Sequence, residues 1–287
     1  MSSQAAAVDL GVSAAWCVMP RSMLAVTGSD AEAFLQGQLT QDVAALAPQQ
    51  SAWSLVLAPQ GRIDAFVRVS RLGPEHFVLD TDGLLGPLLE RLDRFMLRTK
   101  ATLEPVRWGC MSIRGYQDHL VAVKGHEVRG VCPQGGVDYL GVDVEVPEEL
   151  PQMDEHTFEA HRIMAGWPRM GVDIDQRTIP AEAEIVAHTV SFTKGCFTGQ
   201  ELVARMNSRG NIAPRYLRVL SFHQTAAVAH KDVICDEHEN EIGMITSVAV
   251  DGVGQRKVAL GYIKRSVAMP AMVMVAGNEA VASPVPR

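Results

Sequence analysis

The chain has 287 residues, with 26 Lys and Arg against 33 Asp and Glu, and a formal net charge of −7. An acidic chain is a poor nonspecific binder of nucleic acids and membrane surfaces, so we expect neither as a partner, and an anionic ligand would need a local basic pocket. Hydrophobic residues make up 47% of the sequence, which is ordinary for a globular protein of two or three domains.

The first hundred residues predict an α+β sandwich. Thr27-Gly28-Ser29-Asp30 indicates a turn and N-cap before a helix that carries Phe34 and Leu39. Leucines at helical spacing predict a second helix over 84–96, with Asp82 as its cap. β-rich runs predict strands over 51–57, 63–70 and 76–81. This order, with three strands followed by a helix, favours an α+β fold over a doubly wound parallel sheet.

The rest of the chain predicts short strands over 101–146, one more helix and a barrel. The helix ends at Gly166, with Pro168 beyond it. Two β-rich runs, 242–250 and 257–263, are joined by Asp251-Gly252-Val253-Gly254, a hairpin signal. We therefore expect a small C-terminal β-barrel.

The pattern of the five cysteines and of the apolar segments indicates the cellular compartment of the protein. The number is odd and no C-x-x-C pair occurs, which argues against a disulfide framework and a zinc knuckle. We predict no metal site. The N-terminus lacks a basic and apolar leader, and no apolar stretch is long enough to span a bilayer. These features predict a cytoplasmic protein.

One octapeptide is the most informative segment: Lys194-Gly195-Cys196-Phe197-Thr198-Gly199-Gln200-Glu201. It lies between a predicted strand, 189–192, and a predicted helix, 202–206. The glycines permit backbone angles that a side chain would forbid. A helix N-terminus and the charge of Lys194 both favour the reactive thiolate of Cys196. A buried structural cysteine in a tight turn is the alternative interpretation.

This octapeptide fits at every position the K-G-C-[YF]-x-G-Q-E signature of the YgfZ-like folate-binding proteins, with Phe197 in the aromatic place. These proteins are relatives of the glycine-cleavage T-protein, an aminomethyltransferase, and support iron–sulfur cluster assembly and repair. Three further stretches resemble the same family: 34–43, 59–63 and 162–168. The octapeptide is specific, whereas the other stretches alone would not be.

The resemblance implies the T-protein arrangement, in which three domains surround a central cavity. The first domain is split, covering 16–50 and 145–208, and carries the octapeptide. Residues 51–144 form a ferredoxin-like α+β domain, and 209–282 form the barrel. Tetrahydrofolate or a folate derivative is the implied cofactor, and iron–sulfur client enzymes or assembly proteins are the implied partners.

Two departures from the T-protein pattern affect the function. In that enzyme a Glu that holds the pterin occupies the position of Met164. The enzyme also has two adjacent acidic residues at the positions of Asp64 and Ala65, and only Asp64 is acidic here. These losses, and the gain of Cys196, favour a tetrahydrofolate-binding accessory factor for iron–sulfur enzymes. A folate-dependent aminomethyltransferase or demethylase remains the alternative, and a scaffold that no longer binds folate is a third interpretation.

The candidate site residues follow from this interpretation. Cys196 and Lys194 are expected to carry the chemistry. The pterin needs an apolar wall, for which Trp167 and Trp53 are candidates, and its glutamyl tail needs a cation. The predicted folate-binding residues are Asp64, Arg62, Trp167, Gln200, Glu201 and Arg205.

Overall fold

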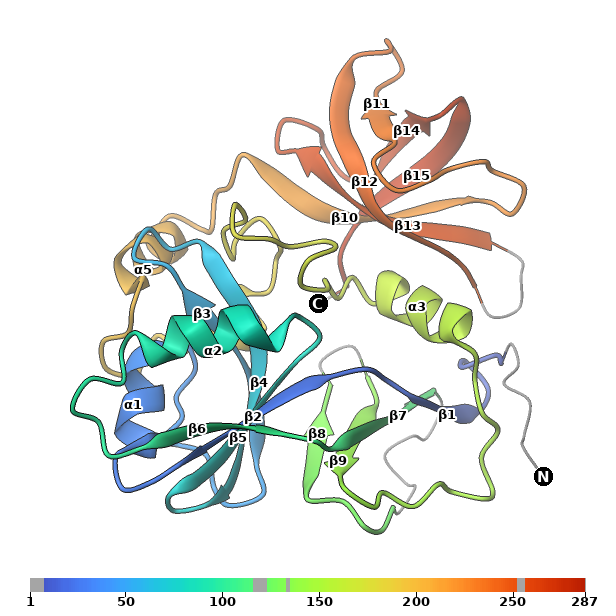
Figure 1. The fold of residues 1–287 in the computed structure, drawn as a ribbon. Coiled ribbons are helices and arrows are strands. Elements are labelled where there is room, and N and C mark those ends of the chain that lie inside the picture. Colours follow the sequence, from blue (N-terminus) through green and yellow to red (C-terminus); the bar gives the residue numbers. More distant parts are fainter. Residues whose placement is uncertain (1–7, 116–122, 133–134, 252–255, 287) are drawn as a thin grey trace.

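The computed structural model describes residues 8–115, 123–132, 135–251 and 256–286. Two antiparallel sheets lie side by side, and a β-barrel lies beyond helix α3 (Glu155–Met164), which separates it from the smaller sheet (Figure 1). The predicted α+β class with a C-terminal barrel is therefore confirmed. The predicted loop over 251–254 lies mostly outside the described residues.

The larger sheet has the strand order β3-β4-β5-β2-β6. Its strands are β2 (Ser22–Thr27), β3 (Ser51–Leu57), β4 (Ile63–Gly73), β5 (His76–Thr81) and β6 (Thr102–Val106). Alternating residues of each strand face opposite sides of a sheet, and here both sides are apolar. One face packs against α1 (Ala31–Gln38) and α2 (Leu85–Asp93), through residues such as Leu35 and Leu88. The other face carries Trp53, Leu55 and Phe66.

Helix α2 begins later than its leucine spacing predicts. Its N-cap is Leu84, which makes no side-chain capping bond, so the predicted cap role of Asp82 is wrong. The chain instead leaves strand β5 at Thr81 and turns, and Asp82 lines a cavity. The carboxyl group is thereby directed toward the site described below.

The smaller sheet has the order β1-β7-β9-β8. Its strands are β1 (Ala14–Val18), β7 (Gly109–Gly115), β8 (Val128–Val131) and β9 (Val137–Gly141). The helix that follows, α3, is capped at Asp154, whose carboxylate accepts from the Thr157 amide. It ends before Gly166, whose φ of +68° suits a glycine and agrees with the predicted end.

The barrel closes in the order β10-β13-β12-β11-β14-β15. Its strands are β10 (Arg215–His223), β11 (Val233–Cys235), β12 (Glu241–Val250), β13 (Arg256–Lys264), β14 (Ala271–Val275) and β15 (Asn278–Pro284). Closure leaves no unpaired sheet edge. The two predicted β-rich runs are β12 and β13, which pair antiparallel. The proposed domain boundaries at residues 50, 144 and 208 remain predictions.

No helix in the described parts of the chain is long and apolar enough to cross a membrane. All five cysteines are free thiols.

Candidate functional site: a polar cavity and a separate cysteine loop

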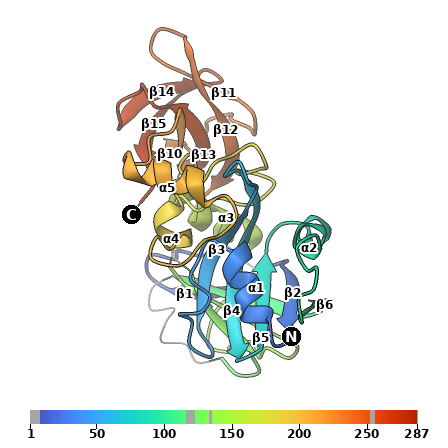
Figure 2. The ribbon, with the colours of Figure 1, turned by 90° about the vertical axis from the view of Figure 1, so that its left-hand side faces the viewer.

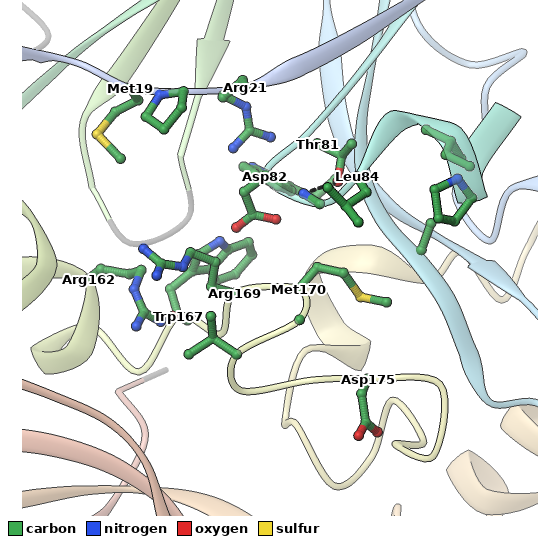
Figure 3. A pocket seen from close by; sticks show the side chains of 18 of the residues that line it. Met19, Arg21, Thr81, Asp82, Leu84, Arg162, Trp167, Arg169, Met170 and Asp175 are labelled. Carbon is green, nitrogen blue, oxygen red and sulfur yellow. Dashed lines mark hydrogen bonds between the residues drawn. The ribbon is translucent and has the colours of Figure 1, made fainter. Parts of the chain in front are cut away.

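A cavity of about 910 Å³ lies where the two sheets meet α3 and the segment after it. Strands of both sheets contribute to its wall, as do the β1–β2 connection, the turn before α2 and residues 167–177. Figure 3 shows Arg21 and Asp82 on one side and Arg162, Trp167 and Arg169 on the other. The wall is both apolar and charged, as expected for a pocket that orients a polar organic ligand.

Two tryptophans contribute to the apolar part of this wall, and a phenylalanine packs behind them. Trp53 and Trp167 line the cavity, and their ring centroids lie 5.1 Å apart at a T-shaped angle of 72°. Phe66 packs against both, at 4.9 Å and 5.3 Å. Interlocked rings of this kind are rigid, so the cavity presents a preformed aromatic surface. Trp167 and Trp53, the candidates for the pterin wall, both line this cavity, and their role toward a pterin remains a prediction.

A buried ion-pair network joins the two sheets at the wall of the cavity, where Arg114 and Asp138 are among the lining residues. Arg68 of β4 donates to Asp80 at 3.0 Å and to Asp138 of β9 at 2.9 Å. Arg114 of β7 donates to Asp138 at 2.8 Å. Burial alone would raise the pKa of Asp138, but Arg114 and Arg68 outweigh it and hold that pKa well below its usual range.

Asp82 is the carboxyl group in the cavity that the sequence analysis assigned to another role. Removal from bulk solvent raises the pKa of Asp82 above its usual value, while the nearby charges of Arg21, Arg162 and Arg169 oppose the rise. Arg162 is itself committed to Asp173, at 2.7 Å, and to Glu159. The sequence signal for a site role of Asp82 was a carboxyl side chain directly after a strand. A residue in that position fits a helix N-cap equally well.

Asp64 also lines the cavity, as a residue of β4. Its carboxylate accepts from Arg91 Nε at 2.9 Å, and the same guanidinium donates to the Leu57 carbonyl, also at 2.9 Å. The neighbouring Ala65 lines the cavity as well and supplies no second carboxylate. Asp64 is therefore engaged by a neighbouring cation rather than free to act on a ligand amine.

Met164 does not lie where the T-protein comparison places a pterin partner. It packs against the cluster that α3 and the barrel share, with Leu217 and Tyr262, and is not among the residues that line the cavity. The pterin-binding argument that the sequence analysis built on Met164 therefore loses its support.

The octapeptide forms a loop away from this cavity, between α4 (Val186–Thr189) and α5 (Gln200–Ser208). The helix after the cysteine is confirmed, whereas the strand predicted over 189–192 is wrong. Thr189 Oγ1 donates to the Ile185 carbonyl at 2.8 Å, and this bond stabilises the helical turn there. Cys196 is exposed. Figure 2 shows α4 and α5 beside β3, on the side of the sheet opposite α2.

Of the two glycines in the loop, Gly199 is the one that the packing requires. It is the N-cap of α5 with φ +80°, and a Cβ there would lie 2.6 Å from the Ala58 carbonyl oxygen. A Cβ on Gly195 would meet no atom within 4 Å. Thr198 N donates to the Gly37 carbonyl, which ties the loop to the end of α1.

Lys194 clamps the loop to the C-terminal end of α1. Its buried Nζ donates to the carbonyls of Gln36, Leu39 and Gln41, at 2.7, 2.7 and 2.8 Å. These carbonyls lie in and just after the last turn of α1, where a cation is favoured by the helix dipole. Burial lowers the pKa of Lys194 to about 8, and Asp42 opposes this shift. The structure thus gives Lys194 a clamping role, and its predicted chemical role remains a prediction.

Lys194→Met should lower the free energy of unfolding by about 1–3 kcal/mol, because the substitution leaves buried carbonyls without a donor. Urea denaturation of the purified protein measures this loss. Lys124→Met, at an exposed lysine, is the matched control and should change stability little. Equal free energies of unfolding for the two variants would contradict a stabilising role of the Lys194 hydrogen bonds.

The predicted site residues therefore separate into two groups. Asp64 and Trp167 line the cavity. The other six do not line it: Cys196, Lys194, Arg62, Gln200, Glu201 and Arg205. Arg62, Glu201 and Arg205 are exposed, and Gln200 begins α5 half-buried. Their predicted folate-binding roles remain predictions, and the cations that line the cavity are different arginines.

Comparison with solved structures defines the class of fold. The glycine cleavage system aminomethyltransferase T of Bartonella henselae matches with a TM-score of 0.79 and 17% identity, over 96% of this chain and 87% of that one. The protein therefore has the aminomethyltransferase fold, as the resemblance implied. No protein-family model matches the chain.

Sequence comparison places the chain among more particular relatives. An uncharacterised protein of Haemophilus influenzae is 28% identical over 80% of this chain and 83% of its own length. The iron–sulfur cluster assembly factor IBA57 homolog of Neurospora crassa is 27% identical over 72% of this chain and 53% of its own length. The tRNA-modifying protein YgfZ of Vibrio vulnificus is 25% identical over 73% of this chain and 70% of its own length. The chain is a distant homologue of the YgfZ and IBA57 proteins.

Proposed function

We propose that this protein is a cytoplasmic, tetrahydrofolate-binding factor that supports the assembly or repair of iron–sulfur enzymes through Cys196. The observation that carries the proposal is the cavity of about 910 Å³, found in a homologue of an iron–sulfur assembly factor and of YgfZ. The homology itself suggests a role in iron–sulfur cluster assembly or tRNA modification. Iron–sulfur client enzymes or assembly proteins are the proposed partners.

The residues of the cavity fit a folate. The volume lies within the roughly 300–1,000 Å³ of typical small-molecule sites. Trp53 and Trp167 supply an apolar surface for a flat heterocycle, and Asp82 supplies an acceptor for its N–H groups. Arg169 and Arg177 line the cavity with side chains that are 34% and 83% exposed, which suits carboxylates that extend toward solvent.

Cys196 acts on a protein partner in this proposal, because it is exposed and does not line the cavity. The loop that carries it is fixed by Lys194 and by the packing of Gly199. A thiol held on a rigid exposed loop can contact a client protein, exchange sulfur or ligate a cluster transiently. Folate binding and the thiol are then two separate parts of one factor.

Cys196→Ala should fail to restore iron–sulfur enzyme activity in cells that lack the native factor, because a methyl group cannot form a thiolate. The assay compares client enzyme activity after expression of wild-type and variant proteins at matched levels. Cys235→Ala, at a partly exposed thiol of the barrel, is the control and should rescue fully. Full rescue by Cys196→Ala would show that the thiol of Cys196 is not needed for this function.

A further inference from the structure

Gly195, the residue before Cys196, is a glycine that the fold itself does not require. Its φ lies outside the left-handed region that favours glycine, and a Cβ there would meet no described atom within 4 Å beyond its chain neighbours. Gly199 differs in both respects. Gly195 and Cys196 are both exposed. The missing side chain therefore leaves the backbone beside the thiol open to close approach from outside the chain.

The segment around this opening carries an excess of positive charge. Residues 190–212 contain Lys194, Arg205 and Arg209 but a single carboxylate, Glu201, in a chain whose net charge is −7. Lys194 is buried in its clamp, whereas both arginines are exposed. Arg205 lies on α5 and Arg209 is its C-cap. Neither side chain makes an ion pair with a residue that the structure describes.

Arg62 joins these two arginines from a distant part of the sequence. It follows Gly61 in the turn between β3 and β4, and a Cβ on Gly61 would lie 2.8 Å from the Cβ of Leu202. The turn therefore packs on the first turn of α5, and the exposed Arg62 lies beside that helix. Among the described residues its side chain has no ion-pair partner either. Three such arginines give an acidic protein a local positive potential.

Apolar side chains near these arginines favour a protein over a nucleic acid as the occupant. Phe192, in the cysteine loop, is 41% exposed, and Ile212, just after α5, is 54% exposed. Protein interfaces are enriched in arginine and aromatic side chains. A nucleic-acid backbone would meet few cations here and would be repelled by a chain of net charge −7. The surface therefore suits an acidic protein segment.

We propose that Arg62, Arg205 and Arg209 form a docking surface for an acidic segment of a partner protein, which passes over Gly195 to reach Cys196. Carboxylates of the segment pair with the guanidinium groups, and the absent side chain at position 195 admits its backbone. The arginines steer and position the partner. The inference rests on the proposed function, in which Cys196 acts on a protein, and it names the chemistry of that protein.

Two peptides test this surface, each with a single cysteine carried as a pyridyl disulfide. One flanks the cysteine with glutamates and the other with lysines. Exchange with the Cys196 thiolate releases thiopyridone, whose absorbance gives the rate. The protein carries Cys235→Ala, because the remaining three cysteines are buried. At low salt the acidic peptide should react about tenfold faster than the basic one, and about 1 M salt should remove most of this preference.

Variants separate the charges from the opening. The triple variant Arg62→Gln, Arg205→Gln and Arg209→Gln should react equally with both peptides, and any change in the thiolate fraction cancels in this ratio. Gly195→Ala should slow both peptides about threefold relative to dithiodipyridine, a small neutral disulfide, because an added methyl group hinders only a chain. Gly86→Ala is the matched control, since a Cβ there also meets nothing within 4 Å.

Equal rates of the two peptides with the parent protein would overturn the docking surface, and so would a preference that survives the triple substitution. Transfer RNA added as a competitor should leave the rates unchanged. Protection of Cys196 by transfer RNA that disappears in the triple variant would assign the surface to a nucleic acid and overturn the proposal. None of these outcomes depends on tetrahydrofolate binding or on rescue in cells, which test the proposed function separately.

Discussion

Purified protein supplied with an aminomethylated carrier protein and tetrahydrofolate should form no methylene-tetrahydrofolate above the no-enzyme control. Asp64 is paired with Arg91 at 2.9 Å, and the next residue is Ala65. Position 65 therefore supplies no second carboxylate beside Asp64 to hold the amine and accept its proton. General-base contributions are typically about 10²–10⁴-fold, so the loss should be plain in the assay.

A genuine aminomethyltransferase run under the same conditions is the positive control for this assay, with ammonia release as a second readout. Turnover near that of the control enzyme would contradict the accessory-factor account and support the transferase alternative. The shared fold alone does not decide between them, because one fold hosts many chemistries.

Asp138→Asn should destabilise the protein by about 3–5 kcal/mol, because it leaves the buried guanidinium groups of Arg68 and Arg114 short of compensating charge. Urea denaturation measures the change, with the exposed Asp143→Asn as the control. The folded-state pKa of Asp138 lies below its usual value of 3.8. Its stabilising contribution is therefore fully present above that pH and is lost as the pH falls below it.

A loss of less than about 1 kcal/mol in Asp138→Asn would show that the ion pairs joining the two sheets contribute little net stability. Buried ion pairs can be close to neutral against apolar replacements of the same shape. The asparagine variant is a sharper test, because it removes one charge and keeps the shape.

Much of the fold follows from local patterns that the sequence shows directly. Strands β3 and β5 have the predicted bounds, and the barrel strands β12 and β13 lie within one residue of theirs. Alternating and helical spacing of apolar residues depends only on neighbours along the chain. The wrong strand over 189–192 shows the limit of this signal, because tertiary contacts override a weak β propensity in a short run.

The site depends on contacts between residues far apart in the sequence, and this is why most of it could not be predicted. Lys194 meets carbonyls more than 150 residues away, at Gln36, Leu39 and Gln41. Arg21 reaches the cavity because Asp80, 59 residues later, holds its Nε. A single arginine in a sequence fits a solvated surface equally well.

Titration of tetrahydrofolate into wild-type, Arg169→Ala and Arg205→Ala proteins tests the central claim most directly. Arg169 lines the cavity, whereas the exposed Arg205 lies on α5 beside the cysteine loop. The account predicts binding by the wild type, a loss of about tenfold in Arg169→Ala because one charge-assisted contact is removed, and no change in Arg205→Ala. Absence of binding by the wild type would contradict the account, and so would a loss confined to Arg205→Ala.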